Sequence, residues 1–138
     1  MQSNPPITLG TTLMRGIRCR CPHCGVGKLF SKFLRVADTC THCGEELHHH
    51  RADDLPAYLV ILILGHILVP GVVILEVDYS PPYWVQAAIW LPLIPIISLA
   101  LLQPCKGAVV AVEWFNGMRG FAPAKERRLA LAKDSQTH

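Results

Sequence analysis

The sequence predicts an α-helical membrane protein in which a hairpin of two transmembrane helices follows a small cysteine-rich module. The 138 residues, enough for about one domain, are 51% hydrophobic and only 17% charged, a composition that leans toward membrane proteins. Residues 55–75 and 79–105 contain no Asp, Glu, Lys or Arg. Each run is long enough to cross a bilayer, which takes roughly 20 apolar helical residues. Ahead of them, four cysteines occur as two C-x2-C pairs.

The N-terminal part is expected to consist of a flexible arm, residues 1–16, and a cysteine module, residues 17–47. Residues 1–20 contain two prolines and scattered arginines but no compact apolar core of a secretory signal. In the module, fifteen residues separate the two pairs, a spacing typical of a zinc ribbon. The intervening "KLFSKFLRV" is strand-like. We therefore expect a zinc-ribbon β-hairpin module whose metal ligands are Cys21, Cys24, Cys40 and Cys43.

Four thiolates around one ion predict a structural Zn²⁺ site, because a catalytic zinc keeps one coordination position open. A rubredoxin-like iron site, two disulfides and a redox-active dithiol would use the same cysteines and remain alternatives. Cys19 is expected to be free, and His23 and His42, inside the pairs, are expected to face solvent. The three histidines at 48–50 are interpreted either as a metal-delivery site or as a titratable linker.

The remaining elements follow from the hydropathy and charge pattern. Asp53 or Asp54 is placed to cap the first transmembrane helix, and Pro56 suits its first turn. Pro81 and Pro82 prevent the helix from continuing through the loop. The expected order is a linker at 48–54, transmembrane helix 55–76, a short outer loop at 77–82, transmembrane helix 83–104, an amphipathic or extended helix at the inner interface at 105–120 and a basic cytoplasmic tail at 121–138.

The charged residues predict the orientation and the partners. Basic residues lie before the first span and after the second, whereas the loop between the spans carries Glu76 and Asp78 and no basic residue. Lys and Arg stay on the cytoplasmic side of a membrane, so both termini are expected to be cytoplasmic. The net charge of +3 then reflects topology, and no nucleic-acid partner is expected. Because two helices bury little of each other, a homo-oligomer or a larger membrane complex is expected in addition to the lipid bilayer.

His66 lies near the middle of the first uncharged stretch. Pro70, four residues later, leaves the His66 carbonyl without its helical hydrogen bond. An ionisable residue at this depth is a functional candidate, so His66 is a candidate cofactor-binding residue, for haem or copper, or a proton carrier. The alternative is a neutral histidine hydrogen-bonded to Ser98, Gln86 or a partner helix.

The segments "RCRCPHCGVGKLFSKFLRVADTCTHCG", "RADDLPAYLVILILGHILVP", "EVDYSPPYWVQAAIWLPL" and "LLQPCKG" together resemble the domain of unknown function 983 family, over about residues 15–118. The resemblance implies a small bacterial inner-membrane protein with a cytoplasmic zinc ribbon and two helices. Leu55 departs from the glycine expected at its position. Members are often encoded beside haem-copper oxidase subunits and their assembly factors, which implies a role in respiratory oxidase biogenesis.

Three functions are compatible with these features. The sequence shows no serine–histidine–acid set, P-loop or dinucleotide-binding glycine pattern. We therefore expect a non-enzymatic accessory or assembly protein, with cytochrome oxidase subunits as candidate partners. The alternative is metal or haem handling through the histidine run, Cys19, Cys105 and His66, which predicts a second metal equivalent. An enzyme acting on lipid or quinone is disfavoured, since Asp54 and His66 lie about 18 Å apart along a helix.

Overall fold

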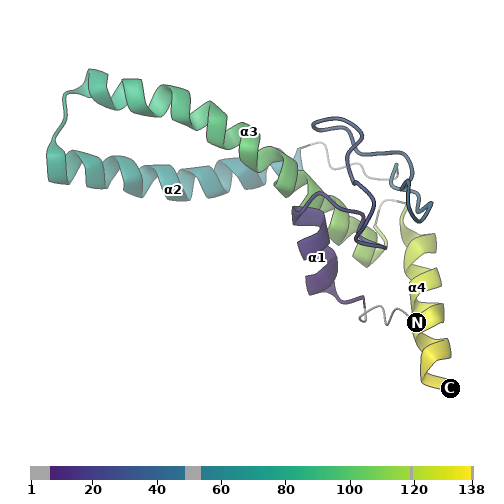
Figure 1. Ribbon diagram of the computed structural model, residues 1–138. Coiled ribbons are helices and arrows are strands. Elements are labelled where there is room, and N and C mark those ends of the chain that lie inside the picture. Colours follow the sequence, from purple (N-terminus) through teal and green to yellow (C-terminus); the bar gives the residue numbers. More distant parts are fainter. Residues whose placement is uncertain (1–6, 49–53, 119, 138) are drawn as a thin grey trace.

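The computed structural model describes residues 7–48, 54–118 and 120–137. These residues form α1 (Leu9–Ile17), α2 (Leu55–Tyr79), α3 (Tyr83–Asn116) and α4 (Ala122–Thr137), joined by irregular segments. α2 and α3 run side by side as a long hairpin, and the other elements gather around the far end of α3 (Figure 1). We call this second body the head; it comprises α1, residues 18–48, the end of α3 from Gly107 onward, and α4.

The hairpin confirms the two long apolar helices predicted from the sequence. Each is long and apolar enough to cross a membrane, by length and composition. Of the most apolar 18-residue stretch in each helix, only 11% in α2 and 0% in α3 is buried inside the molecule. The core helix of a soluble protein would be mostly buried, so these apolar faces need cover from outside the chain.

The turn of the hairpin is shorter than the predicted outer loop at 77–82. α2 continues to Tyr79 because nothing before Pro81 blocks helical geometry, and the left-handed Ser80, with φ of 41°, ends it. Only residues 80–82 then separate the two helices. Next to the turn, the Gln86 side-chain amide donates a hydrogen bond to the Glu76 carboxylate and so joins α3 to α2.

The start of α2 agrees with the prediction in position but not in capping. Asp54 occupies the N-cap, and Pro56 is buried in the first turn. The Asp54 side chain makes no capping hydrogen bond. Asp53, the other candidate cap, lies outside the described residues.

The second apolar helix does not end at 104. α3 runs without interruption for 34 residues, through Pro92, Pro95 and Pro104, to Asn116. Of the two alternatives predicted for 105–120, an extension of the helix or a segment along the inner interface, the structure has the extension, and its residues from Gly107 to Trp114 are largely buried in the head. A proline costs a helix one hydrogen bond but does not have to break it when the surrounding packing holds both halves. One continuous helix therefore links the hairpin to the head.

The expected flexible arm at 1–16 is wrong for its described part, because residues 9–17 form α1. Thr8 and Thr11 cap the helix reciprocally through their side chains and backbone N–H groups. α1 crosses α3 at two glycines: a Cβ on Gly16 would overlap the Gly107 carbonyl oxygen and lie 2.6 Å from Ala111 Cβ. Small residues at both sites let the two backbones touch, and this contact orders α1.

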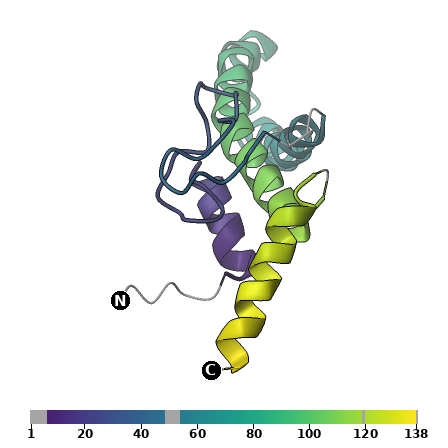
Figure 2. The same cartoon turned by 90° about the vertical axis from the view of Figure 1, so that its right-hand side faces the viewer.

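The cysteine module at residues 17–47, which we call the ribbon, does not form the predicted β-hairpin. The described residues between α1 and α2 contain three isolated bridges and no strand. Leu29 lies between two of these bridges: its N–H donates to the Cys19 carbonyl, and its carbonyl accepts from the Ala37 N–H. The ribbon packs on a helix instead of on a sheet: Leu29, Phe30 and Leu47 are buried in one cluster with Val110 of α3. Figure 2 shows the ribbon and α1 on the same side of α3.

The C-terminal segment, predicted as a basic tail at 121–138, forms α4. Gly117 ends α3 in the left-handed conformation, with φ of 68°, which allows the chain to turn back. Phe121 and Ala124 are then buried against Trp114 of α3. The rest of α4 is mostly exposed and extends away from the hairpin (Figure 1).

Candidate metal centre

The two C-x2-C pairs adopt the same turn. In each, the glycine after the second cysteine donates its N–H to the carbonyl of the first cysteine at 2.9 Å, Gly25 to Cys21 and Gly44 to Cys40. Both glycines have positive φ, 70° and 73°, a conformation that glycine adopts without steric cost. The repeat of one turn explains why both pairs are followed by glycine.

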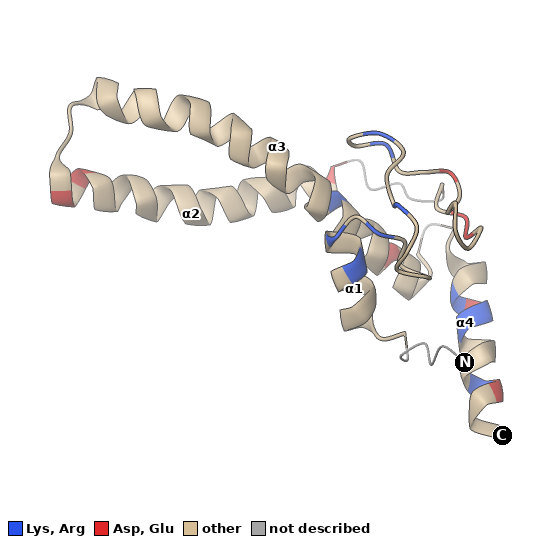
Figure 3. Ribbon diagram, in the orientation of Figure 1, with Lys and Arg blue, Asp and Glu red and all other residues tan. Residues whose placement is uncertain are grey.

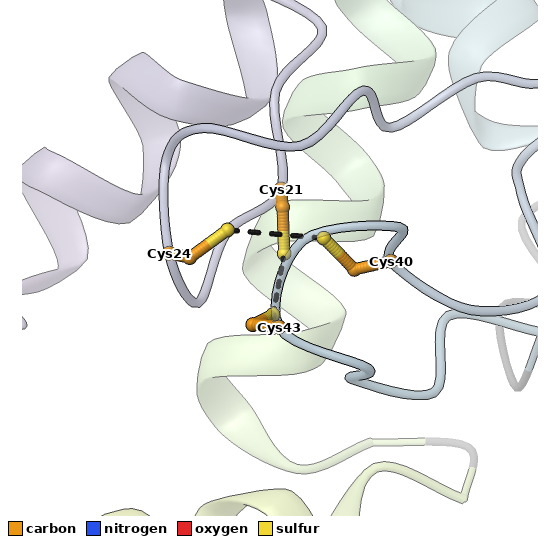
Figure 4. Close-up of side chains that lie close together, drawn as sticks. All are labelled: Cys21, Cys24, Cys40 and Cys43. Carbon is orange, nitrogen blue, oxygen red and sulfur yellow. Dashed lines mark hydrogen bonds between the residues drawn. The ribbon is translucent and has the colours of Figure 1, made fainter.

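The four sulfur atoms converge on one point. Figure 4 shows the side chains of Cys21, Cys24, Cys40 and Cys43 pointing toward one another from two loops. The Sγ atoms of Cys21 and Cys43 lie 3.8 Å apart, as do those of Cys24 and Cys40, and all four lie within 4.8 Å of one another. A tetrahedron with metal–sulfur bonds of about 2.3 Å has edges of about 3.8 Å, whereas a disulfide bond is about 2.05 Å long. The four predicted ligands therefore form a cluster of metal-binding size.

The protonation of the thiols fits a cation site. Burial raises the pKa of Cys21, and burial also raises the pKa of Cys43 to about 11. Burial acts in the same direction on Cys24, but hydrogen bonds from the backbone N–H groups of Gly27 and Val26 and from neighbouring thiols outweigh it and lower the pKa of Cys24 to about 6. The protein alone thus favours the thiolate of Cys24, whereas Cys21 and Cys43 need a positive charge beside them to lose their protons. A divalent metal supplies that charge and displaces the protons as it binds.

α1 supports the first turn of the centre. Nη1 of Arg15 donates hydrogen bonds to the backbone carbonyls of Pro22, at 3.2 Å, and of His23, at 2.8 Å. A positively charged donor makes stronger hydrogen bonds than a neutral one. Because α1 is itself fixed by the glycine crossing with α3, Arg15 connects the metal centre to the helix that enters the hairpin.

Trp114 of α3 connects the centre to α4. Its indole is buried and packs edge-on against the His23 ring, with 5.9 Å between the centroids and an interplanar angle of 69°. His23 therefore does not face solvent as predicted; His42, in the second pair, is exposed as predicted. Trp114 Nε1 donates to the buried Glu45 carboxylate at 3.3 Å, and Arg127 of α4 pairs with the same oxygen at 3.3 Å. Glu45 thus joins the ribbon, α3 and α4.

The other candidate residues lie apart from the cluster. Cys19 and Cys105 are half-buried free thiols that do not belong to it, and burial raises the pKa of Cys19. His48 is exposed, and the two histidines after it lie outside the described residues. His66 is exposed on α2, and its Nδ1 lies 2.7 Å from the Leu62 carbonyl oxygen of its own helix. The side chains of Ser98 and Gln86 form hydrogen bonds with other residues: Ser98 with Ile94, and Gln86 with Glu76 and Trp90. Among the described residues, the only group of three or more metal-ligating side chains is the four-cysteine cluster.

The sequence interpretation missed the residues that fix the cluster to α3. Arg15, Glu45 and Trp114 carry no motif, because their partners are 7 to 82 residues away along the chain. A signal for the helix crossing was present: Gly107 and Ala111 are small residues four apart, a pattern that permits close helix packing.

A family model described as "Protein of unknown function (DUF983)" matches residues 30–114, which is more than half of the chain. The match includes Cys40, Cys43, both helices of the hairpin and the buried end of α3. No curated protein and no solved structure is similar enough to be matched. The chain belongs to the DUF983 family, as its motifs predicted.

Proposed function

We propose that this protein is a non-enzymatic membrane accessory or assembly protein. Its cytoplasmic head, whose fold is stabilised by a bound metal, binds a partner at a fixed position relative to the bilayer. The observation that carries this proposal is the continuity of α3. Its first part forms the hairpin, and its last turns, including Val110, are buried in the ribbon core. A binding surface on the head is therefore connected to the hairpin through a continuous helix, on whose end the head is packed, and not through a flexible linker.

The membrane location rests on exposure and charge. Almost none of the most apolar residues of α2 and α3 are buried inside the molecule, so a lipid environment would remove their apolar surface from water. Figure 3 shows acidic residues at the tip of the hairpin, no charged residue along its length, and the basic residues gathered in the head. Under the positive-inside rule, this distribution favours a head and both termini on the cytoplasmic side. The family resemblance implies that the membrane is the inner membrane of a bacterium.

The metal has a structural role in this proposal. The four cysteines would hold Zn²⁺, with iron as the alternative for the same sulfur tetrahedron. When bound, the metal supplies the folding energy of a ribbon too small to form a core of its own. The protein contributes the two glycine turns, the Arg15 contacts to the first turn and the packing on Val110.

The partner is proposed to be a membrane protein complex. Large apolar side chains along the hairpin, such as Ile61 at 66% and Leu91 at 72% exposure, are available to pack against other transmembrane helices. The family resemblance makes subunits of a haem-copper respiratory oxidase the first candidates, and a second copy of this chain is the alternative occupant.

Affinity purification from native membranes tests the proposal. The tagged protein is extracted in mild detergent, and the eluate is analysed by mass spectrometry and for metals. We expect oxidase subunits together with one zinc per chain. Cys43→Ser should lose both the zinc and the subunits, while the matched control Cys19→Ser, outside the cluster, should keep both.

Each other outcome of the purification contradicts a specific part of the proposal. Recovery of the protein alone from membranes that contain the oxidase would refute docking to that complex. A zinc-free Cys43→Ser variant that still recovers the subunits would show that the head is not the docking surface. A second metal equivalent, or bound haem, would instead support metal or haem handling, with His66 as the next residue to change.

A further inference from the structure

Residues 31–35, Ser31 to Arg35, form an ordered loop at the edge of the ribbon. Ser31 donates its backbone N–H to the Arg35 carbonyl at 2.8 Å and its hydroxyl to the same oxygen at 3.2 Å. The loop stands on a bridge between Phe30 and Val36, which are both buried. At its tip, by contrast, the Phe33 side chain is 53% exposed. A large aromatic group held outward on a closed turn is a feature that the docking function does not account for.

One hydrogen bond fixes the position of this loop relative to the hairpin. Nζ of Lys106 donates to the Leu34 carbonyl at 2.8 Å. Lys106 is the first charged residue of α3 after the uncharged stretch at 79–105. The loop is therefore held beside the point at which α3 leaves its apolar segment, as Figures 1 and 2 show from two directions. In a membrane, that point is the boundary between acyl chains and headgroups.

The residues of the loop fit this boundary chemically. Lys32 and Arg35, on either side of Phe33, are both exposed. An aromatic side chain flanked by cations suits the interface, where the ring enters the apolar region and the cations meet lipid phosphates. The cytoplasmic leaflet carries anionic lipids, so its charge is opposite to that of the loop.

We propose that the 31–35 loop is a membrane anchor that binds the anionic headgroups of the leaflet from which α3 emerges. Phe33 enters the headgroup boundary, and Lys32 and Arg35 bind lipid phosphate. The proposal rests on the membrane insertion proposed above. The contact between this loop and the headgroups lies off the axis of α3. It would therefore prevent the head from tilting about the end of the hairpin.

Site-specific photo-crosslinking tests the anchor. p-Benzoylphenylalanine replaces Phe33 in the full-length protein, which is reconstituted into vesicles of phosphatidylglycerol and phosphatidylethanolamine, irradiated and analysed by mass spectrometry. Two control positions carry the same group: Ile67, 56% exposed on α2, and Leu131, 68% exposed on α4. We expect lipid adducts from positions 33 and 67 and none from position 131.

The controls separate the two proposals. Lipid adducts at 67 but not at 33 would overturn the anchor and leave the membrane hairpin intact. No lipid adduct at either position would overturn membrane insertion itself. A crosslink from 33 to a second copy of the chain, in place of lipid, would also overturn the anchor and would assign the loop to an interface between copies.

The charges are tested in the same experiment. With the crosslinker at position 33, the double variant Lys32→Gln/Arg35→Gln should lower the yield of phosphatidylglycerol adduct at least about threefold. The control Lys125→Gln/Lys133→Gln removes the same net charge from exposed positions of α4 and should leave the yield unchanged. Equal yields in both double variants would refute the phosphate contacts.

Discussion

The crossing of α1 and α3 gives the sharpest stability prediction, because one substitution has opposite effects at two positions of the same helix. In Gly16→Ala, the new Cβ overlaps the Gly107 carbonyl oxygen, which is backbone and cannot rotate away. In Gly10→Ala, the nearest atom to the new Cβ is the Thr8 hydroxyl oxygen at 4.0 Å, an ordinary contact. Overpacking of this kind costs about 3 kcal/mol at the upper end, and the gain in helix propensity from Gly to Ala is about 1 kcal/mol. Gly16→Ala should therefore destabilise the head by about 2 kcal/mol, while Gly10→Ala should be neutral or stabilising by up to about 1 kcal/mol.

Urea unfolding of the head in detergent measures this difference. Replacing Trp84 and Trp90 by Phe leaves Trp114, which is buried in the head, as the single tryptophan. For a small unit that loses about 1 kcal/mol of stability per molar urea, Gly16→Ala should lower the midpoint of the Trp114 emission change by about 2 M. If both alanine variants moved the midpoint in the same direction by similar amounts, the close crossing of the helices would be refuted.

Three further predictions concern the metal centre and its supports. Cys43→Ser should reduce the metal content from one to nearly zero per chain by elemental analysis, while Cys19→Ser should keep it; equal loss in both would contradict the assigned ligand set. Arg15→Gln removes the charged donor from two carbonyls of the first turn, so zinc release to a chromogenic chelator should accelerate about tenfold, and an unchanged rate would count against this support. Glu45→Ala leaves the buried Trp114 N–H without its acceptor and should cost the head about 2 kcal/mol in the urea assay, whereas exposed Glu126→Ala should stay within about 0.5 kcal/mol.

Local patterns were sufficient to predict the four-cysteine cluster and the two apolar helices. The C-x2-C spacing with its following glycine defines a turn within five residues, so each half of the site is encoded locally. The uncharged stretches likewise define helices through their length and composition, since a chain in lipid must satisfy its own backbone hydrogen bonds. The family assignment followed from these same motifs.

Local patterns failed where the structure depends on contacts between distant residues. Residues 9–17 look like part of an arm until α3 offers a glycine at position 107 for them to cross. The strand-like segment between the cysteines forms no strand among the described residues, because its apolar side chains pack on Val110 of α3. Position 105 looked like a boundary because charged residues begin there, although the helix itself continues to Asn116.

The sequence by itself thus determined the parts of this protein: a four-cysteine cluster of metal-binding size, two helices long enough for a membrane, and the family. The tertiary structure alone decided that these parts form one body. Helix propensity and hydropathy act within a few turns, but rigidity arises from buried contacts such as those of Val110 and Trp114, whose partners are far away in the chain. For that physical reason, the fixed relation between metal centre and hairpin, on which the proposed function depends, becomes visible only when the chain is folded.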